Sequence, residues 1–169
     1  TVLSRGLGDV YKRQLYKIKY KYDSVLWIFD RLVIAVALGG TLVRIGNFFN
    51  SEIVGVFTNS DYGVIFQNRG EILPRHPAQL YEALGYIILF ITLVFIYNKT
   101  NLKSKKGFLF GFFLMFLFVV RFIVEYVKES QGGLEEQLGI FSTGQWLSIP
   151  FILMGIGLMI YSYLSIEKK

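Results

Sequence analysis

The sequence predicts an all-α, polytopic membrane helix bundle with about four spans and a small ordered extracytoplasmic loop region. Its composition is the first observation: of 169 residues, 53% are hydrophobic and only 18% are charged, whereas soluble domains carry about 25% charged residues. The second is a set of long runs with few charges, and the third is an uneven distribution of Lys and Arg between the loops. The 16 Phe and 11 Tyr residues exclude a disordered chain.

Two residue counts limit the chemistry. The chain has no Cys, which excludes a disulfide scaffold, a Cys-ligated metal site and any reaction of its own thiol. Its single His excludes a multi-His metal centre. We therefore expect neither a metal nor a cofactor.

The opening residues 1–14 differ from the rest of the chain. They lack an initiator Met, an apolar core and a signal-peptide cleavage site, so we interpret them as a non-native leader. The membrane-embedded core then comprises residues 15–169.

Four runs are long enough to cross about 30 Å of hydrocarbon, which takes about 20 helical residues. Trp27 and Trp146 fall near span ends, where indole rings prefer to lie. Gly39, Gly40 and Gly46, and the pair Gly107 and Gly111, suggest close helix contacts. The predicted spans are residues 25–49, 78–97, 107–127 and 145–163.

The loop from residue 50 to 77 is too long for a bare connector. Asn59-Ser60-Asp61-Tyr62-Gly63 predicts a turn, and Val64-Ile65-Phe66 predicts a short strand. We expect this loop to form a small ordered lid at the outer membrane surface.

The distribution of cations predicts the orientation. Counted from residue 12 onward, eleven cations lie before the first span, between the second and third, and after the fourth, against three in the other two loops. Cations favour the cytoplasmic side, so we expect both termini there. No basic face with interleaved aromatic residues lies outside these loops, so we expect no nucleic-acid partner. The eleven are Lys12, Arg13, Lys17, Lys19, Lys21, Lys99, Lys103, Lys105, Lys106, Lys168 and Lys169, and the three are Arg69, Arg75 and Lys128.

Charged residues at membrane depth are the main functional signal. Such a side chain costs roughly 2.5–3.5 kcal/mol on insertion scales, so it normally faces a cavity or a partner. Arg44, Glu82, Arg121 and Glu125 lie within or at the ends of spans. Because guanidinium groups match phosphate oxygens, an anionic lipid headgroup held by Arg44 and Arg121 is our hypothesis.

Plainer interpretations of the same residues remain open. Arg121 and Glu125, four residues apart, would also form a self-neutralising pair on one helix. Arg44 and Asn47 would also fit an interhelical hydrogen-bond cluster. His76 is a candidate proton carrier or simply a hydrogen-bonding residue beside Pro77.

Four sequence blocks resemble the prolipoprotein diacylglyceryl transferase family over about residues 25–165. The first two contain Arg44, Asn47, Asn50, Glu52 and Gly55, and then Pro74-Arg75-His76-Pro77-Ala78-Gln79-Leu80-Tyr81-Glu82. The other two are Arg121-Phe122-Ile123-Val124-Glu125 and Gly144-Gln145-Trp146-Leu147-Ser148. The order and spacing of the blocks agree with the family patterns.

The resemblance implies a reaction and its substrates. In the bacterial cytoplasmic membrane, a diacylglyceryl group would move from phosphatidylglycerol to the lipobox Cys thiol of a prolipoprotein signal peptide. The absence of Cys is compatible with this, because the nucleophile belongs to the substrate.

The resemblance also implies roles for residues. Arg44 would bind the lipid phosphate, and Arg121, oriented by Glu125, would stabilise the leaving phosphate. Asn47, Asn50 and Glu52 would line the headgroup site, and His76 or Glu52 would serve as base for the thiol. The remaining substrate-binding candidates are Gly55, Arg75, Gln79, Tyr81 and Glu82.

One departure limits the match. The family carries further N-terminal spans with a His-Gly motif assigned to catalysis, which this chain lacks, so we expect a C-terminal fragment. A small transporter or channel subunit and an inactive structural remnant are the alternatives. An enzyme predicts that the outward loop and Arg44, Arg121 and His76 converge on one lipid-accessible pocket, whereas a transporter predicts a polar path continuous to the cytoplasmic face.

Overall fold

The computed structural model describes residues 25–129 and 141–165, and within them four long helices dominate. All four are long and apolar enough to cross a membrane. This confirms the all-α bundle of four spans. The helices are α2 (Val25–Phe49), α3 (Ala78–Lys99), α4 (Phe108–Val124) and α6 (Thr143–Leu164).

The helix boundaries differ from the predicted ones by a few residues, for local reasons. Helix α6 begins at Thr143 because Ser142 and Gln145 form a capping box: the Ser142 hydroxyl accepts from the Gln145 amide, and the Gln145 side chain accepts from the Ser142 amide. Helix α4 gives way at Glu125 to the short 3₁₀ helix η3 (Glu125–Val127). The predicted leader, residues 1–14, lies outside the described residues.

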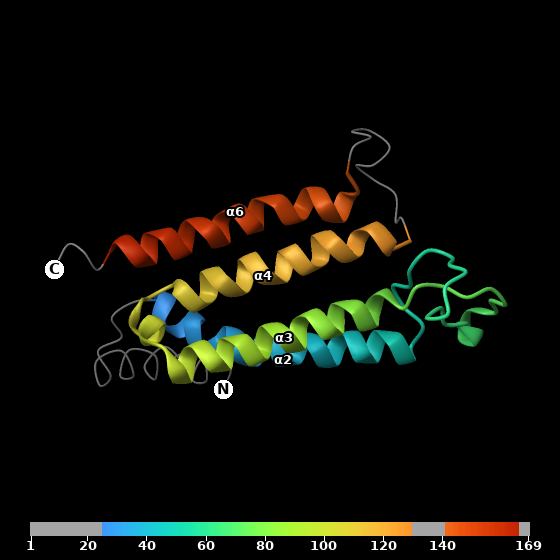
Figure 1. The fold of residues 1–169 in the computed structure, drawn as a ribbon, viewed down its shortest axis with the longest axis horizontal. Coiled ribbons are helices and arrows are strands. Elements are labelled where there is room, and N and C mark those ends of the chain that lie inside the picture. The colour runs from blue at the N-terminus through green and yellow to red at the C-terminus, as the bar shows by residue number, and fades with distance from the viewer. Residues whose placement is uncertain (1–24, 130–140, 166–169) are drawn as a thin grey trace, which may run out of the picture.

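The helices lie roughly lengthwise beside one another (Figure 1). Helices α2 and α3 form one pair, and α4 lies between that pair and α6. The loop from residue 50 to 77, called the lid below, is at one end, and the short 3₁₀ helix η2 (Asn101–Ser104) is at the other. An apolar core fills the space between α2, α3 and α4, formed by Val33, Ala37, Leu89, Leu93, Leu109, Phe113 and Leu114.

The end opposite the lid is fixed by a buried carboxylate that our sequence analysis missed. Asp30 of α2 accepts hydrogen bonds from the backbone amides of Gly107 (2.6 Å) and Phe110 (2.9 Å). These amides belong to the first turn of α4, where backbone donors have no partner within the helix. Asp30 therefore caps α4 from a neighbouring helix.

The glycines predicted to mark close helix contacts divide into two groups. Gly111 of α4 lies against Gly155 of α6, so a Cβ added at Gly155 would come within 2.6 Å of the Gly111 carbonyl. Gly107, which has a φ of 91° and starts α4, lies against Leu26 of α2, and Gly40 of α2 lies against Tyr86 of α3. Gly39 and Gly46 have no neighbour within 4 Å of an added Cβ, so the interpretation of these two as contact points is wrong.

The lid is ordered by isolated bridges rather than by strands. Arg75 pairs through its backbone with both Phe57 and Val64, and Gly55 pairs with Lys128. The turn predicted over residues 59–63 is present, since the Gly63 amide donates to the Ser60 carbonyl. The strand predicted at residues 64–66 is wrong: only Val64 forms a bridge, because Arg75 also pairs with Phe57.

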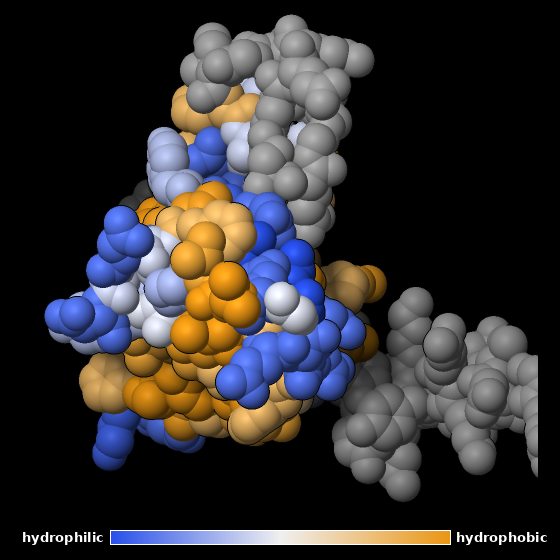
Figure 2. Space-filling model, turned by 90° about the vertical axis from the view of Figure 1, so that its right-hand side faces the viewer, coloured by the Kyte–Doolittle hydropathy of each residue, from blue (hydrophilic) through white to orange (hydrophobic). Residues whose placement is uncertain are grey.

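The outer surface of the lid is mixed in character. Seen from this end, hydrophobic residues form a band between hydrophilic ones (Figure 2). Phe57, Tyr62 and Ile72 are among the exposed apolar side chains of the lid. The lid therefore presents an amphipathic surface at one end of the bundle.

Candidate active site

Two of the predicted site residues, one from α2 and one from α3, form an ion pair below the lid. Arg44 Nε lies 2.7 Å from Glu82 Oε2, and the side chains are 15% and 0% exposed. A buried carboxylate is costly unless it is paired, so Glu82 depends on this contact. Arg44 is thereby held in place at the lid end of the bundle.

Lys128 is a second partner of Glu82, and our sequence analysis treated it only as a loop cation. Its Nζ lies 3.0 Å from Glu82 Oε1 and 3.6 Å from Glu125 Oε2. The spacing of Arg121, Glu125 and Lys128 by four and then three residues would have revealed a shared helical face. Lys128 therefore joins the carboxylates of α3 and η3.

Arg121 keeps a donor without a partner. Its guanidinium carbon lies 5.7 Å from the centre of the Phe118 ring, and its Nε is buried with no hydrogen-bond partner. Glu125 forms its ion pair with Lys128, and its carboxylate packs against Gly144. Among the described residues, no ion pair joins Arg121 to Glu125.

Tyr86 connects the two arginines. It is buried one turn after Glu82 on α3 and interacts electrostatically with Glu82, Arg44 and Arg121. Both guanidinium groups therefore lie near the same phenol. We call Arg44, Glu82, Arg121, Glu125 and Lys128 the charged cluster, which holds three cations and two carboxylates.

The start of α3 is tied to the segment that follows α2. The Gln79 side chain donates from Nε2 to the Glu52 carbonyl (2.6 Å), and the Glu52 amide donates to the Asn47 carbonyl (2.9 Å). Gln79 is buried, whereas the side chains of Asn50 and Glu52 are exposed. The structure thus brings Asn47, Glu52 and Gln79 together mainly through backbone groups.

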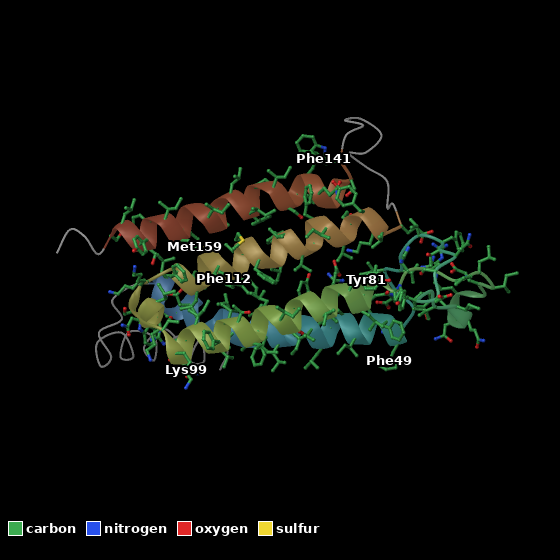
Figure 3. All side chains as sticks on the ribbon, in the orientation of Figure 1. Phe49, Tyr81, Lys99, Phe112, Phe141 and Met159 are labelled. Carbon is green, nitrogen blue, oxygen red and sulfur yellow. The ribbon has the colours of Figure 1, made fainter. Side chains whose placement is uncertain are left out.

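His76 is placed at the junction of the lid and α3. Its Nδ1 lies 3.2 Å from the Tyr81 hydroxyl, and its carbonyl accepts from the Gly55 amide. Tyr81 is at the lid end of α3, far from Lys99 at the other end (Figure 3). His76 and Tyr81 contact each other, and no described contact joins either of them to the charged cluster.

Arg75 and Gly55 are part of the internal structure of the lid. Arg75 is buried, and its guanidinium donates to Glu71 (2.6 Å) and to the Gly55 carbonyl (3.0 Å) and pairs with Glu129 (3.1 Å). It also lies 3.8 Å from the centre of the Phe57 ring. The hydrogen bond from Arg75 holds the pKa of the Glu71 carboxyl below its ordinary value.

An open cavity of about 240 Å³ lies between Phe48, Phe49 and Ser51 and lid residues 64–68, outside the cluster. Within the described residues, no group of His, Asp and Glu could hold a metal ion.

Comparison with known proteins gives a consistent assignment. The model of a family described as prolipoprotein diacylglyceryl transferase matches residues 10–161. A phosphatidylglycerol–prolipoprotein diacylglyceryl transferase of Tolumonas auensis is 46% identical over 158 residues, covering 93% of this chain and 60% of the relative. Proteins of the same name are 40% identical over 157 residues in Bacteroides fragilis (92% and 55% covered) and 39% identical over 146 residues in Chlamydia trachomatis (86% and 53% covered).

The chain spans between about half and three fifths of the length of these curated relatives. No solved structure matches it. Its four apolar helices agree with a multi-pass membrane protein. On the extent of the family match and the identity to its members, this chain belongs to the prolipoprotein diacylglyceryl transferase family.

Proposed function

We propose that this chain takes part in transferring a diacylglyceryl group from phosphatidylglycerol to the lipobox Cys thiol of a prolipoprotein. The names of its relatives support both substrates. The observation that carries the proposal is the charged cluster below the lid, where Arg44 pairs with Glu82, Lys128 pairs with Glu82 and Glu125, and Arg121 retains an unpaired donor.

The reaction needs positive charge near the phosphate of the group that leaves. The substrate thiol attacks a glycerol carbon, a C–S bond forms, and the C–O bond to the phosphate breaks. Glycerol phosphate leaves with the electron pair of that bond. Fixed donors near this phosphate stabilise the charge that accumulates on it.

The charged cluster suits the stabilisation of a phosphate because it holds three cations and only two carboxylates. Glu82 is shared between Arg44 and Lys128, so Lys128 still neutralises Glu82 when Arg44 turns toward a phosphate. Arg121 then supplies the second guanidinium. In this proposal Glu82 and Glu125 position the cations, and Arg44 and Arg121 contact the phosphate.

A base must accept the thiol proton. His76 and Glu52 are our two candidates, and both lie where the lid meets the helices. Asn47, Asn50 and the start of α3 would line the headgroup site beside them. The thiol proton would pass to His76 or Glu52, depending on which of these two side chains faces the thiol.

The described residues give less support to a transporter. Toward the opposite end of the bundle, the core between α2, α3 and α4 consists of apolar side chains. The buried acid at that end, Asp30, is fully used in capping α4. The described part of the chain therefore provides no continuous polar path from the charged cluster to that end.

We also propose the orientation and the membrane. The lid would face outward from the bacterial cytoplasmic membrane, and both termini of this chain would be cytoplasmic. Lys99, Lys103, Lys105 and Lys106 lie at the end opposite the lid, as the positive-inside rule requires.

The test is transfer of a diacylglyceryl group to a lipobox peptide in phosphatidylglycerol nanodiscs. Arg44→Ala and Arg121→Ala would be compared at equal expression, in this chain and at matching positions of the Tolumonas auensis relative. We expect each to lower turnover at least about 100-fold, the usual cost of removing one donor to a developing anion. Lys103→Ala, at the opposite end, is the control. Unchanged turnover in both arginine variants would refute the proposal.

A further inference from the structure

Two buried glutamines in this protein differ in how well their side chains are satisfied. Gln145 is 3% exposed; its Nε2 donates to the Phe122 carbonyl and its Oε1 accepts from the Ser142 amide. Gln79 is 1% exposed, and its Nε2 donates to the Glu52 carbonyl. Its Oε1 is buried with no partner. A buried acceptor without a donor costs about 1–3 kcal/mol, so it needs an explanation.

The orientation of the Gln79 amide is fixed by its partner. A backbone carbonyl only accepts hydrogen bonds, so the group that faces the Glu52 carbonyl must be the NH₂. The carbonyl oxygen of Gln79 therefore points elsewhere and requires a donor. Rotating the amide would place two acceptors against each other and would not remove the problem.

The unpartnered oxygen belongs to the same face of α3 as the charged cluster. Gln79 precedes Glu82 by three residues, and side chains at this spacing are neighbours on a helix. Glu82 forms ion pairs with Arg44 through Oε2 and with Lys128 through Oε1, and of the two oxygens only Oε1 has a hydrogen-bond partner. The charged cluster thus offers an unused donor at Arg121 Nε, and Gln79, outside the cluster, offers an acceptor with neither a hydrogen bond nor an ion pair.

Charge decides which kind of donor fits Gln79. The cluster has three cations and two carboxylates, so its excess charge is positive. An ammonium group, as in phosphatidylethanolamine, would be repelled by this excess positive charge. A hydroxyl group brings a donor without a charge. A positively charged cluster with an unused acceptor on the same face of α3 therefore matches a phosphate ester that carries a free hydroxyl.

We propose that Gln79 Oε1 accepts a hydrogen bond from a hydroxyl of the glycerol phosphate headgroup, making Gln79 a specificity-determining residue for phosphatidylglycerol. This inference rests on the proposed function, since it assumes that the charged cluster holds the phosphate of that lipid. Because Gln79 is 1% exposed, the hydroxyl reaches it only when neighbouring side chains move aside. The Glu52 contact keeps the amide correctly oriented meanwhile.

The test compares lipids that differ only in the headgroup. The 169-residue chain in phosphatidylcholine nanodiscs would receive either phosphatidylglycerol or phosphatidylpropanol, which has the same phosphate but no headgroup hydroxyl. Bound lipid would be counted by native mass spectrometry. We expect a preference of about 3- to 10-fold for phosphatidylglycerol, the range of one neutral hydrogen bond. Equal binding of the two lipids by the unmodified chain would overturn the inference before any variant is made.

Two leucine variants separate recognition from folding. Gln79→Leu is expected to abolish the preference while binding of phosphatidylpropanol stays the same. Gln145→Leu, the matched control, removes a glutamine that is fully satisfied. It should lower the unfolding temperature but keep the preference. A preference that survives in Gln79→Leu, or that disappears equally in Gln145→Leu, would contradict the assignment.

Two further arms identify the source of the headgroup and separate the two proposals. If free glycerol phosphate displaces the lipid in a way that depends on Gln79, the headgroup alone is recognised. If free glycerol phosphate does not displace the lipid, the whole lipid is required. Both results agree with the assignment. Peptide transfer is measured in parallel. A Gln79-dependent preference without transfer would support the inference and refute the activity of this chain. Peptide transfer in which the unmodified chain and Gln79→Leu show the same lipid preference would refute the inference and support the activity of this chain.

Discussion

Arg44, Arg75 and Arg121 each lie in one of the sequence blocks that resemble the family, but they differ in how many of their hydrogen-bond donors are already used. Arg75 is bound to Glu71, Glu129 and a backbone carbonyl, so its guanidinium stabilises the lid. Arg44 has Glu82 as its partner, and Arg121 retains a buried, unpaired Nε. A guanidinium has five N–H donors, and those still available decide whether it binds a ligand. Arg121 is therefore the best placed of these three arginines to bind a ligand.

The ion pair between Glu71 and Arg75 makes the lid sensitive to acid. The hydrogen bond from Arg75 lowers the pKa of Glu71 in the folded protein below the ordinary 4.5. A lowered pKa contributes stability that is present above the unfolded pKa and is lost as the pH falls through the folded value. We expect exchange of the Val64 and Arg75 amides, corrected for intrinsic rates, to be flat above about pH 5 and to accelerate below pH 4.5.

The control for this prediction is a second acidic residue of the lid. Glu71→Gln should exchange faster at neutral pH and show a smaller acid step. Asp61→Asn, in the exposed turn, should behave like the unmodified chain. An unchanged acid step in Glu71→Gln would assign the sensitivity to another group.

Gly55 is needed because three segments meet at its backbone. An added Cβ would lie 2.5 Å from the Val127 carbonyl and 2.6 Å from the His76 carbonyl. Backbone atoms cannot move aside cheaply, so we expect Gly55→Ala to destabilise the protein by about 1–3 kcal/mol and to loosen the lid. Thermal unfolding and proteolysis in nanodiscs measure both effects.

Gly46→Ala provides the comparison. No atom lies within 4 Å of a Cβ at Gly46 in α2, and Ala favours a helix. We expect its stability to be unchanged or slightly higher. If Gly55→Ala were as stable as Gly46→Ala, the packing described for Gly55 would be wrong.

At the scale of elements, α4 is the helix around which the others are organised. Asp30 of α2 caps its start, Gly111 lets α6 approach its first turn, and Lys128 ties the segment after it to α3. Without a hydrophobic driving force between helices in lipid, such close packing and polar contacts hold a bundle together. Arg121 and Glu125 are positioned by these three attachments.

The contact between α4 and α6 can be tested with two glycines of the same helix. Gly155→Leu would drive a side chain into the Gly111 carbonyl and the Met115 amide, each 2.6 Å from an added Cβ. We expect a loss of about 1–3 kcal/mol from overpacking. Gly157→Leu meets nothing within 4 Å and should change stability by less than about 0.5 kcal/mol.

Both substitutions gain the same helix propensity, so the difference between them reports packing alone. The measurement is the unfolding temperature in detergent, followed by cross-linking between α4 and α6. Equal behaviour of the two variants would show that α6 does not depend on this contact.

At the scale of the whole molecule, the lid and the lysine-rich connection occupy opposite ends of the bundle (Figure 1). The chain contains no Cys, so single introduced cysteines report topology directly. In intact cells we expect an impermeant maleimide to label Asn59→Cys in the lid but not Lys103→Cys in the connection. After the membrane is opened, both should react. Labelling of Lys103→Cys alone in intact cells would reverse the proposed orientation.

Sequence patterns were enough for the number, type and approximate position of the helices. Crossing a membrane requires a long apolar run with internally satisfied backbone, and such runs are visible without any tertiary information. The turn over residues 59–63 was equally local. The strand at residues 64–66 was not, because whether a segment forms a strand depends on its partner, and Arg75 pairs with two segments at once.

By itself, the sequence determined that residues 25–129 and 141–165 contain four helices able to cross a membrane, and which charged residues lie at the lid end of their bundle. Only the tertiary structure decided how these residues pair. It assigned Glu82 to Arg44 and Lys128, Arg75 to the lid, and Asp30 to the start of α4. The physical reason is that hydrophobicity acts over whole segments and is encoded locally, whereas ion pairs and hydrogen bonds depend on distances of about 3 Å between segments far apart in the chain.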